Sequence, residues 1–452
     1  MLSVWAPLLF EFLAIADDAS MEQDVMPLGV YWPTNLGFPD LEGDERWEKI
    51  EEVMKSLQEH HVNTIWLNHG RADLQAEYAR RADKYGIRLV AAISTIHTET
   101  KRLRDGYEQR VERALAAWGD APVPLAWGIG DEPYTRGMPE VATCAESWTS
   151  RDQPIALVVM PRDIPTTAEL VPLDFIASDV YAYFGKDCPN GPNTQAQAKA
   201  YILDVMDKLL KATDNHQNMS AWFMGGAFQN IAGPSRLSPN GDYVILPGGG
   251  NNFRMPTPAE TRWQSWLGVA GGARGIFMFT LFFYETPRTS PLVGDWGRME
   301  EYDTGFPGGL LYPDGRPTVQ YGAMGQSFAR IKKAAPYLMR ITPKEDRLAF
   351  HAKGWSDHGD TIANFVDEAD GSRYVVVING DLNNEAEVPV NVPKRIERIE
   401  DLCSGAEVVT TEEYDNHWAP IGTPFRQFRV KLAPGSGTLL RLQCERVKAG
   451  TE

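Results

Sequence analysis

The chain has 452 residues, which is too long for one average domain, and its hydrophobic fraction of 43% and charged fraction of 23% are typical of a globular protein. Its formal net charge of −17 makes nucleic acid and anionic membranes poor partners, because an acidic surface repels phosphate groups. The sequence contains no apolar run of about 18 residues, so it indicates no membrane span.

An apolar segment precedes the regular part of the sequence. Residues 2–15 read LSVWAPLLFEFLAI, which is typical of a secretory signal and would place the protein outside the cell or in the periplasm. Glu11 interrupts the segment and no Lys or Arg precedes it, so a mis-assigned start and a cytoplasmic location stay open. We expect residues 1–24 to be a leader or a disordered segment.

From residue 27 onward, short apolar runs alternate with amphipathic segments. Eight such units predict parallel strands joined by helical crossovers and closed into a (β/α)₈ TIM barrel. An open doubly wound sheet is the alternative, but no glycine-rich nucleotide-binding motif follows the first run. The predicted strands are residues 27–32, 64–69, 89–94, 124–132, 155–160, 175–183, 221–229 and 275–284. The predicted helices are residues 47–57, 74–85, 102–118, 139–148, 196–210 and 258–269, the last with Thr257 as its N-cap.

After residue 340, short strand-like runs follow one another without helices, separated by turns of Gly, Asp, Asn and Pro. This pattern predicts a C-terminal antiparallel β-sandwich. We therefore divide the chain into a barrel over residues 25–342 and an accessory sandwich over residues 343–448. The predicted strands are residues 347–351, 361–366, 374–379, 386–392, 396–402, 407–410, 425–432 and 437–442.

The four cysteines do not form a disulfide framework in a chain of this length. Cys403 and Cys444 both fall in the predicted sandwich, where they either pair or remain buried thiols. No CxxC spacing occurs, and the first strand lacks the His-x-His of metal-dependent barrels, so we predict neither a metal nor a cofactor.

The fourth predicted strand carries the strongest chemical signal. It ends Trp127-Gly-Ile-Gly-Asp131-Glu132-Pro133-Tyr134, and the active sites of such barrels lie at the C-terminal ends of the strands. A carboxyl group beside apolar neighbours and a second carboxylate retains its proton near neutral pH and can donate it to a leaving oxygen. The structural alternative is that Asp131 caps a helix and Glu132 forms a surface ion pair.

These residues resemble the Asn-Glu-Pro motif of the large clan of retaining glycosidases built on (β/α)₈ barrels. The resemblance implies that Glu132 is the acid/base of a glycoside hydrolase acting on a neutral or weakly charged oligo- or polysaccharide. The stretches from Pro256 to Trp266, from Gly271 to Phe279 and from Leu432 to Leu442 also look like uncharacterised members of this group.

Two features depart from the clan. Asp131 replaces its Asn, and Gln229 ends the seventh strand, where the clan has a nucleophilic Glu; an amide cannot form the glycosyl ester. The adjacent acids also resemble substrate-assisted β-N-acetylhexosaminidases, in which the Asp orients an acetamido group. Inversion with Asp179 or Glu285 as the base is a third mechanism, and a non-catalytic glycan-binding barrel is the alternative outside enzymes.

The other predicted site residues lie at strand ends and suit the apolar faces and polar edges of sugars. Asp179 ranks after Asp131 and Glu132 as a catalytic residue. The expected substrate-binding residues are Trp32, Asn68, His69, Tyr134, Tyr181, Gln229 and Glu285.

Overall fold

The structure is a computed structural model that describes most of the chain. The residues that it describes are 25–34, 37–38, 40–68, 71–93, 95, 103–149, 151, 153–184, 193–214, 216, 219–228, 230–231, 235–237, 243–245, 252–282, 309–343, 359–394, 396–408, 410–414 and 425–444. The predicted leader and the predicted site residues His69, Gln229 and Glu285 lie outside them, as does the predicted strand at 347–351.

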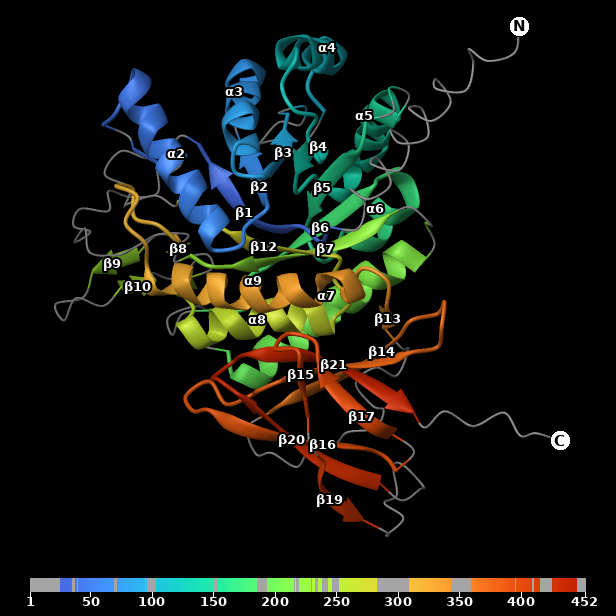
Figure 1. Ribbon diagram of the computed structural model, residues 1–452. Coiled ribbons are helices and arrows are strands. Elements are labelled where there is room, and N and C mark those ends of the chain that lie inside the picture. Colours follow the sequence, from blue (N-terminus) through green and yellow to red (C-terminus); the bar gives the residue numbers. More distant parts are fainter. Residues whose placement is uncertain are drawn as a thin grey trace, which may run out of the picture.

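The N-terminal part is the predicted barrel, closed by parallel pairing in the order β1-β12-β7-β6-β5-β4-β3-β2. All eight predicted strands are confirmed, and Figure 1 shows them surrounded by helices. They are β1 (Leu28–Pro33), β2 (Thr64–Asn68), β3 (Arg88–Ala92), β4 (Ala126–Asp131), β5 (Ile155–Val159), β6 (Phe175–Val180), β7 (Ser220–Gly226) and β12 (Gly275–Phe279).

The six predicted helices are confirmed, and two more are present. The helices are α2 (Gly43–Glu59), α3 (Ala72–Asp83), α4 (Tyr107–Trp118), α5 (Met138–Thr149), α6 (Ile164–Leu170), α7 (Gln195–Asp214), α8 (Pro258–Ala270) and α9 (Val319–Leu338). Helix α9 was not predicted, because it packs on α8 and on a strand of the second unit, so its buried residues are not confined to one stripe. Over the described residues, none of these helices has the length and apolar character needed to span a membrane.

Alternate residues of the barrel strands fill its interior. Tyr31, Trp66, Ala177, Trp222 and Phe277 belong to one buried cluster inside the barrel, whereas their sequence neighbours pack against the helices. This alternation follows from the two-residue period of a strand, and it decides which side chains can reach the rim.

Four short strands follow β7 and form two antiparallel pairs. Strand β8 (Asn230–Ile231) pairs with β11 (Asn252–Phe253), and β9 (Ser235–Leu237) pairs with β10 (Tyr243–Ile245). An isolated bridge between Phe184 and Phe253 joins this segment to the residues after β6. Residues that follow two different barrel strands therefore lie side by side at the rim.

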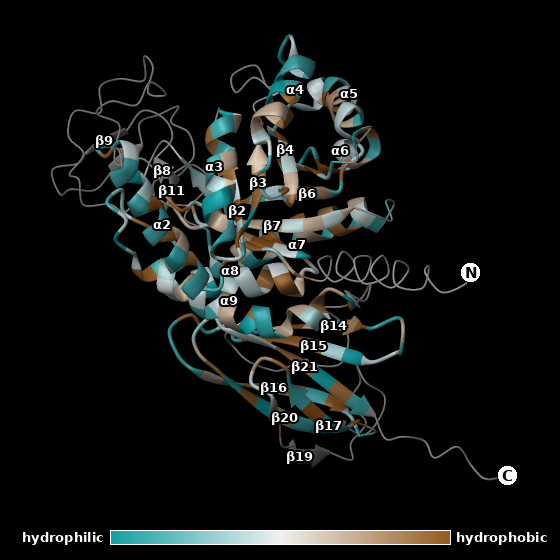
Figure 2. Cartoon of the chain, turned by 45° about the horizontal axis from the view of Figure 1, so that its top comes forward, coloured by the Kyte–Doolittle hydropathy of each residue, from teal (hydrophilic) through white to brown (hydrophobic). Residues whose placement is uncertain are grey.

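The C-terminal unit consists of two antiparallel sheets, as predicted. One has the order β13-β14-β15-β21-β17-β18 and the other β16-β20-β19, and valine, leucine, isoleucine and phenylalanine side chains from both form a common core. Figure 2 shows these hydrophobic residues along the strands. The strands are β13 (Thr342–Pro343), β14 (Thr361–Val366), β15 (Arg373–Ile378), β16 (Ala386–Pro393), β17 (Ile396–Asp401), β18 (Ala406–Glu407), β19 (Thr410–Tyr414), β20 (Phe425–Leu432) and β21 (Gly437–Cys444).

The six-stranded sheet also packs against the barrel through α8 and α9, which lie between the two units in Figure 1. Arg262 donates a hydrogen bond to the Pro434 carbonyl oxygen at 2.9 Å, and Arg330 donates one to the Gly437 carbonyl oxygen at 3.0 Å. A Cβ atom at Gly437 would lie 2.5 Å from the Trp266 ring, so this close approach requires glycine. The segment before Leu442 therefore has a docking role.

The disulfide alternative for Cys403 is wrong. Cys403 is a buried, unpaired thiol, and so is Cys144 on α5. Burial raises the pKa of the Cys403 thiol, because the apolar surroundings disfavour the thiolate. Cys403 belongs to the apolar cluster that the six-stranded sheet shares with the barrel, and a separate apolar core holds the two sheets of the sandwich together.

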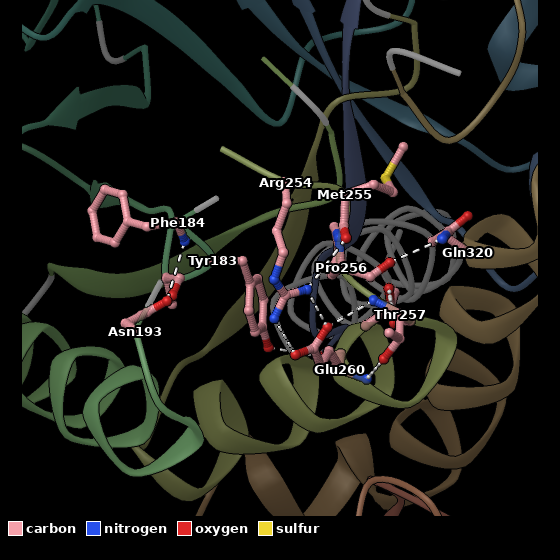
Figure 3. Close-up of polar contacts among 11 residues, drawn as sticks. Tyr183, Phe184, Asn193, Arg254, Met255, Pro256, Thr257, Glu260 and Gln320 are labelled. Carbon is pink, nitrogen blue, oxygen red and sulfur yellow. Dashed lines mark hydrogen bonds and ion pairs between the residues drawn. The ribbon is translucent and has the colours of Figure 1, made fainter. Parts of the chain in front are cut away.

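The start of α8 is anchored by Glu260, as Figure 3 shows. Thr257 is the N-cap, as predicted, and it forms a reciprocal capping box with Glu260. The Glu260 carboxylate also accepts hydrogen bonds from both terminal nitrogens of Arg254, at 2.7 and 2.5 Å. Arg254 in turn lies 5.1 Å from the centre of the Tyr183 ring. One carboxylate thus joins the helix to the segment after β11 and to the residues after β6.

We expect Glu260→Ala to lower the free energy of unfolding by about 2 kcal/mol, because it removes both a capping box and a largely buried ion pair. Glu260→Gln retains an acceptor for the Thr257 amide, so its free energy of unfolding should fall by about half as much as that of Glu260→Ala. Urea denaturation of the two variants measures this difference; equal losses would show that the Arg254 pair alone matters.

Candidate functional site

Strand β4 brings Asp131 to the barrel interior through a one-residue bulge. Gly128 pairs with Ala156 of β5, but Asp131 pairs with Val158, so three residues of β4 advance along only two of β5. Val158 lies in the interior cluster, and paired residues on neighbouring strands share a face. Without the bulge, Asp131 would face the helices.

The backbone at Glu132 changes direction a second time. Its φ of 47° lies in the left-handed region, which is unfavourable for a residue with a Cβ, and its amide donates to the Val158 carbonyl oxygen at 2.9 Å. The carboxyl groups of both Asp131 and Glu132 consequently raise the pKa values of the same two half-buried side chains, Asp179 and Tyr181. The bulge and the left-handed residue together allow two adjacent residues to face one space.

Asp179, on β6, provides a third carboxyl group. It follows Phe175 and Ala177 on the inward face of the strand. Burial, the charge of Glu132 and the charge of Asp131 raise its pKa well above its usual value. The neighbouring Glu132 side chain also raises this pKa, because two carboxyl groups in contact disfavour the ionised form of Asp179.

Tyr181 lies beside this pair and donates a hydrogen bond to Asp179. This bond lowers the pKa of Asp179 but does not outweigh burial and the neighbouring charges. Asp179 therefore keeps its proton to a higher pH than an ordinary aspartic acid, because a neighbouring carboxylate disfavours its ionisation. No group of three or more His, Cys, Asp or Glu among the described residues is arranged to hold a metal ion.

Tyr31 and Asn68 approach the acids from β1 and β2. The Asn68 side-chain amide donates a hydrogen bond to the Tyr31 hydroxyl oxygen. Burial raises the pKa of Tyr31 well above its usual value, and the charges of Asp131, Asp179 and Glu132 add to this effect. The phenol therefore lies within the field of all three carboxyl groups.

Aromatic rings form a continuous wall next to the acids. The Tyr31 ring lies 4.8 Å from that of Phe279, which lies 5.4 Å from that of Tyr181. Tyr181 in turn lies 4.8 Å from Phe228 and 5.5 Å from Phe253. Such a wall beside carboxyl groups suits a ligand with an apolar face and polar edges.

The structure brings together five of the predicted site residues: Asn68, Asp131, Glu132, Asp179 and Tyr181.

The prediction that Trp32 faces the substrate is wrong. Trp32 is 1% exposed and packs outside the strands against Tyr78 and Phe282, at ring distances of 5.6 and 5.7 Å. Strand alternation puts Tyr31 inside and Trp32 outside. Tyr134 is 39% exposed, with Arg136 5.5 Å from its ring centre, and its contact with substrate stays a prediction.

Tyr31 is the residue that the sequence reasoning missed. Gly29 and Tyr31 share one face of β1, and a Cβ atom at Gly29 would lie 2.4 Å from the ring of Phe277, its pairing partner on the adjacent strand β12. A glycine in a strand often marks a crowded face, and residues two apart in a strand point to the same side. The spacing between Gly29 and Tyr31 was therefore a signal in the sequence that Tyr31 faces the barrel interior.

The sequence matches no protein-family model and no curated protein. Among solved structures, it is similar to alpha-L-fucosidase isoenzyme 1 from Paenibacillus thiaminolyticus, with 9% identity, a TM-score of 0.42, and coverage of 95% of this chain and 99% of that chain. It is also similar to the endo-beta-1,4-mannanase from Thermotoga petrophila, with 10% identity, a TM-score of 0.45, and coverage of 94% of this chain and 96% of that chain. The alpha-L-arabinofuranosidase from Thermotoga maritima is a third similar structure, with 11% identity, a TM-score of 0.46, and coverage of 92% of this chain and 96% of that chain. The barrel is established by its own strand pairing, and the function proposed below is built from the residues of the site.

We expect Glu132→Gly to be more stable than Glu132→Ala by about 1 kcal/mol, because glycine adopts the left-handed backbone without a steric penalty. Both variants lack the carboxyl group, so the comparison isolates the backbone. Chemical denaturation provides the measurement, and an alanine variant at least as stable as the glycine variant would contradict a strained backbone.

We expect the stability gained by Asp179→Asn to grow as the pH rises above about 4. The folded-state pKa of Asp179 is raised above its unfolded value of about 3.9, so its favourable contribution is complete below that value and is lost as the pH rises towards the folded pKa. Melting temperatures from pH 3 to 9 measure this, with the exposed Glu169→Gln as a control for the loss of one charge. A constant difference between Asp179→Asn and wild type would contradict the raised pKa.

Proposed function

We propose that the protein is a glycoside hydrolase that cleaves a glycosidic bond in an oligo- or polysaccharide. The observation that carries this proposal is the group of three acids, Asp131, Glu132 and Asp179, at the ends of β4 and β6, with an aromatic wall beside them. Cleavage needs a proton for the leaving oxygen and a carboxylate near the developing positive charge, and this cluster contains both.

In this proposal Glu132 delivers the proton. Both side chains are half-buried, but Oδ1 of Asp179 has no accessible surface, so we assign proton delivery to Glu132. Asp179 holds a proton that it can pass to Glu132. The glycosidic C–O bond breaks, the leaving oxygen takes the proton of Glu132, water adds its hydroxyl group to the sugar carbon, and the remaining proton of the water returns to the carboxyl pair.

Asp131 is the remaining carboxylate and would face the opposite side of the reacting sugar carbon or orient a substrate group. An interaction between the Glu132 and Asp179 side chains raises the pKa of Asp179, and two interacting carboxyl groups leave no space between them for the water that inversion needs, which disfavours Asp179 as an inverting base. The adjacent Asp131 and Glu132 also fit substrate-assisted cleavage of an N-acetylhexosaminide, which is the second candidate mechanism.

The test is a hydrolysis and binding screen of wild type against aryl glycosides, including N-acetylhexosaminides, and plant and algal polysaccharides. We expect Glu132→Gln to lower kcat by about 10² or more, because the amide cannot donate the proton as an acid. Glu169→Gln makes the same chemical change on the exposed surface of α6 and should keep wild-type activity. Binding without cleavage by wild type and Glu132→Gln alike would instead favour a glycan-binding barrel.

The pH profile tests the pairing of the two acids. We expect Asp179→Asn to move the alkaline limb of kcat/KM to lower pH by about one unit or more, because Glu132 no longer lies beside a second carboxyl group. An unchanged alkaline limb would mean that Asp179 does not govern the protonation of Glu132.

A further inference from the structure

Building on the proposed function, we propose that Thr95 is a positioning residue for Asp131 and Glu132. Thr95 follows β3, and its hydroxyl group holds the backbone of β4 at the bulge. This hydrogen bond keeps the extra residue of the bulge in place, and the two acids that follow it therefore stay at the barrel rim. Thr95 acts through the backbone of β4, because its own side chain is fully buried.

The hydroxyl group of Thr95 meets β4 where its pairing is irregular. Thr95 is 0% exposed, so water cannot replace its hydroxyl group. This group donates a hydrogen bond to the carbonyl oxygen of Ile129. Ile129 is the extra residue between Gly128 and Gly130, which pair with consecutive residues of β5. A side chain from the β3 side thus holds the residue that interrupts the pairing on the β5 side.

The sequence of the bulge does not fix its backbone. Gly128 and Gly130 flank Ile129, and a glycine has no Cβ atom to limit its backbone torsion angles. The Ile129 side chain is 0% exposed and packs in the apolar cluster of the barrel. A hydrogen bond to the Ile129 carbonyl oxygen therefore fixes the peptide group that joins it to Gly130, directly before Asp131.

Thr95 is itself held firmly. Its amide donates to the Ile93 carbonyl oxygen at 2.7 Å, and its carbonyl oxygen accepts from the Arg104 amide at 2.8 Å. The Ile93 amide donates to the Gly128 carbonyl oxygen at 2.8 Å. The segment after β3 is thus tied to two consecutive carbonyl groups of β4, first by a backbone amide and then by the Thr95 hydroxyl group.

The chain after the bulge has separate attachments. The Glu132 amide donates to the Val158 carbonyl oxygen at 2.9 Å, and the Thr135 hydroxyl group donates to the carboxylate of Asp163, which is 2% exposed. Both partners belong to β5 or to the turn after it. Because the downstream segment is held from β5, the position of the two acids depends on how the bulge is held from the side of Thr95.

Three variants separate the hydroxyl group from the volume of the side chain. Thr95→Val has nearly the same shape without the hydroxyl group, and Thr95→Ser retains the hydroxyl group. Thr64→Val is the control, because Thr64 is 2% exposed and donates to the side chain of Asn63 at 2.9 Å, at the start of β2 and the opposite end of the barrel. If Thr95→Val does not fold, Thr95→Ala replaces it, since alanine and serine differ only by the hydroxyl group.

Hydrogen–deuterium exchange measured by mass spectrometry tests the bulge without any substrate. We expect Thr95→Val to speed exchange of the amides of residues 129–132 about 10-fold or more, because the peptide groups of the bulge are no longer held. Thr95→Ser and Thr64→Val should exchange as wild type does in this segment.

Kinetics test the effect on catalysis, with the aryl glycoside that wild type cleaves fastest in the hydrolysis screen. We expect Thr95→Val to lower kcat about 10- to 100-fold, because a small displacement of the proton donor slows the chemical step. KM should stay within about twofold, since the rest of the cleft is unchanged. Thr95→Ser should restore most of kcat, and Thr64→Val should retain wild-type kcat.

Wild-type kcat in Thr95→Val would overturn the positioning role and leave the proposed hydrolase intact. A loss that falls on KM instead of kcat, or that is equal in Thr95→Ser or Thr64→Val, would overturn it as well, because the effect would then come from binding or packing. If wild type cleaves no glycoside, the proposed function falls and the exchange experiment decides alone. Faster exchange in Thr95→Val only would then retain Thr95 as the residue that holds the bulge, and unchanged exchange would overturn it.

Discussion

The bulge in β4 is the constraint on which the site depends. A strand exposes only alternate residues to the barrel interior, so two consecutive side chains cannot normally share one cavity. The extra residue between Gly128 and Asp131 moves Asp131 to the inside, and the left-handed backbone of Glu132 keeps the next side chain beside it. Both features are local: the bulge interrupts the regular pairing of β4 with β5, and the left-handed backbone is unfavourable for a residue with a Cβ atom.

The electrostatics of the site follow from this geometry. Three carboxyl groups lie together at the rim, where Asp131 is exposed and Glu132 and Asp179 are half-buried, and the charges of Asp131 and Glu132 keep the proton on Asp179 to a higher pH than usual. The raised pKa of Asp179 therefore reports a destabilising arrangement in the folded state at neutral pH. Stability comes from other parts of the chain, including the aromatic-rich barrel interior and the docking of α8 and α9 on the second unit.

The two units are joined by hydrogen bonds from side chains to backbone carbonyl oxygens as well as by apolar contacts. Arginines on α8 and α9 donate to carbonyl oxygens on either side of the turn before β21, and Gly437 allows the strand to approach Trp266. The segments from Pro256 to Trp266 and from Leu432 to Leu442, which resemble other barrel proteins, meet at this interface. In this structure they maintain the arrangement of the units, while the acids lie at the ends of β4 and β6.

The sequence by itself determined the eight strands, six of the helices, the second unit and the pair of acids at the end of β4, because hydrophobic periodicity and turn residues are local properties. It also identified Asp179, Tyr181 and Asn68 by their position after apolar runs. Tertiary structure alone decided that Asp131 faces inward, that Asp179 touches Glu132, and that Tyr31 rather than Trp32 reaches the site. Strand register and bulges depend on pairing with a neighbouring strand, so a local sequence pattern cannot predict them. The coupling between two acids depends on contact between residues that are far apart in the chain, so a local pattern cannot predict it either.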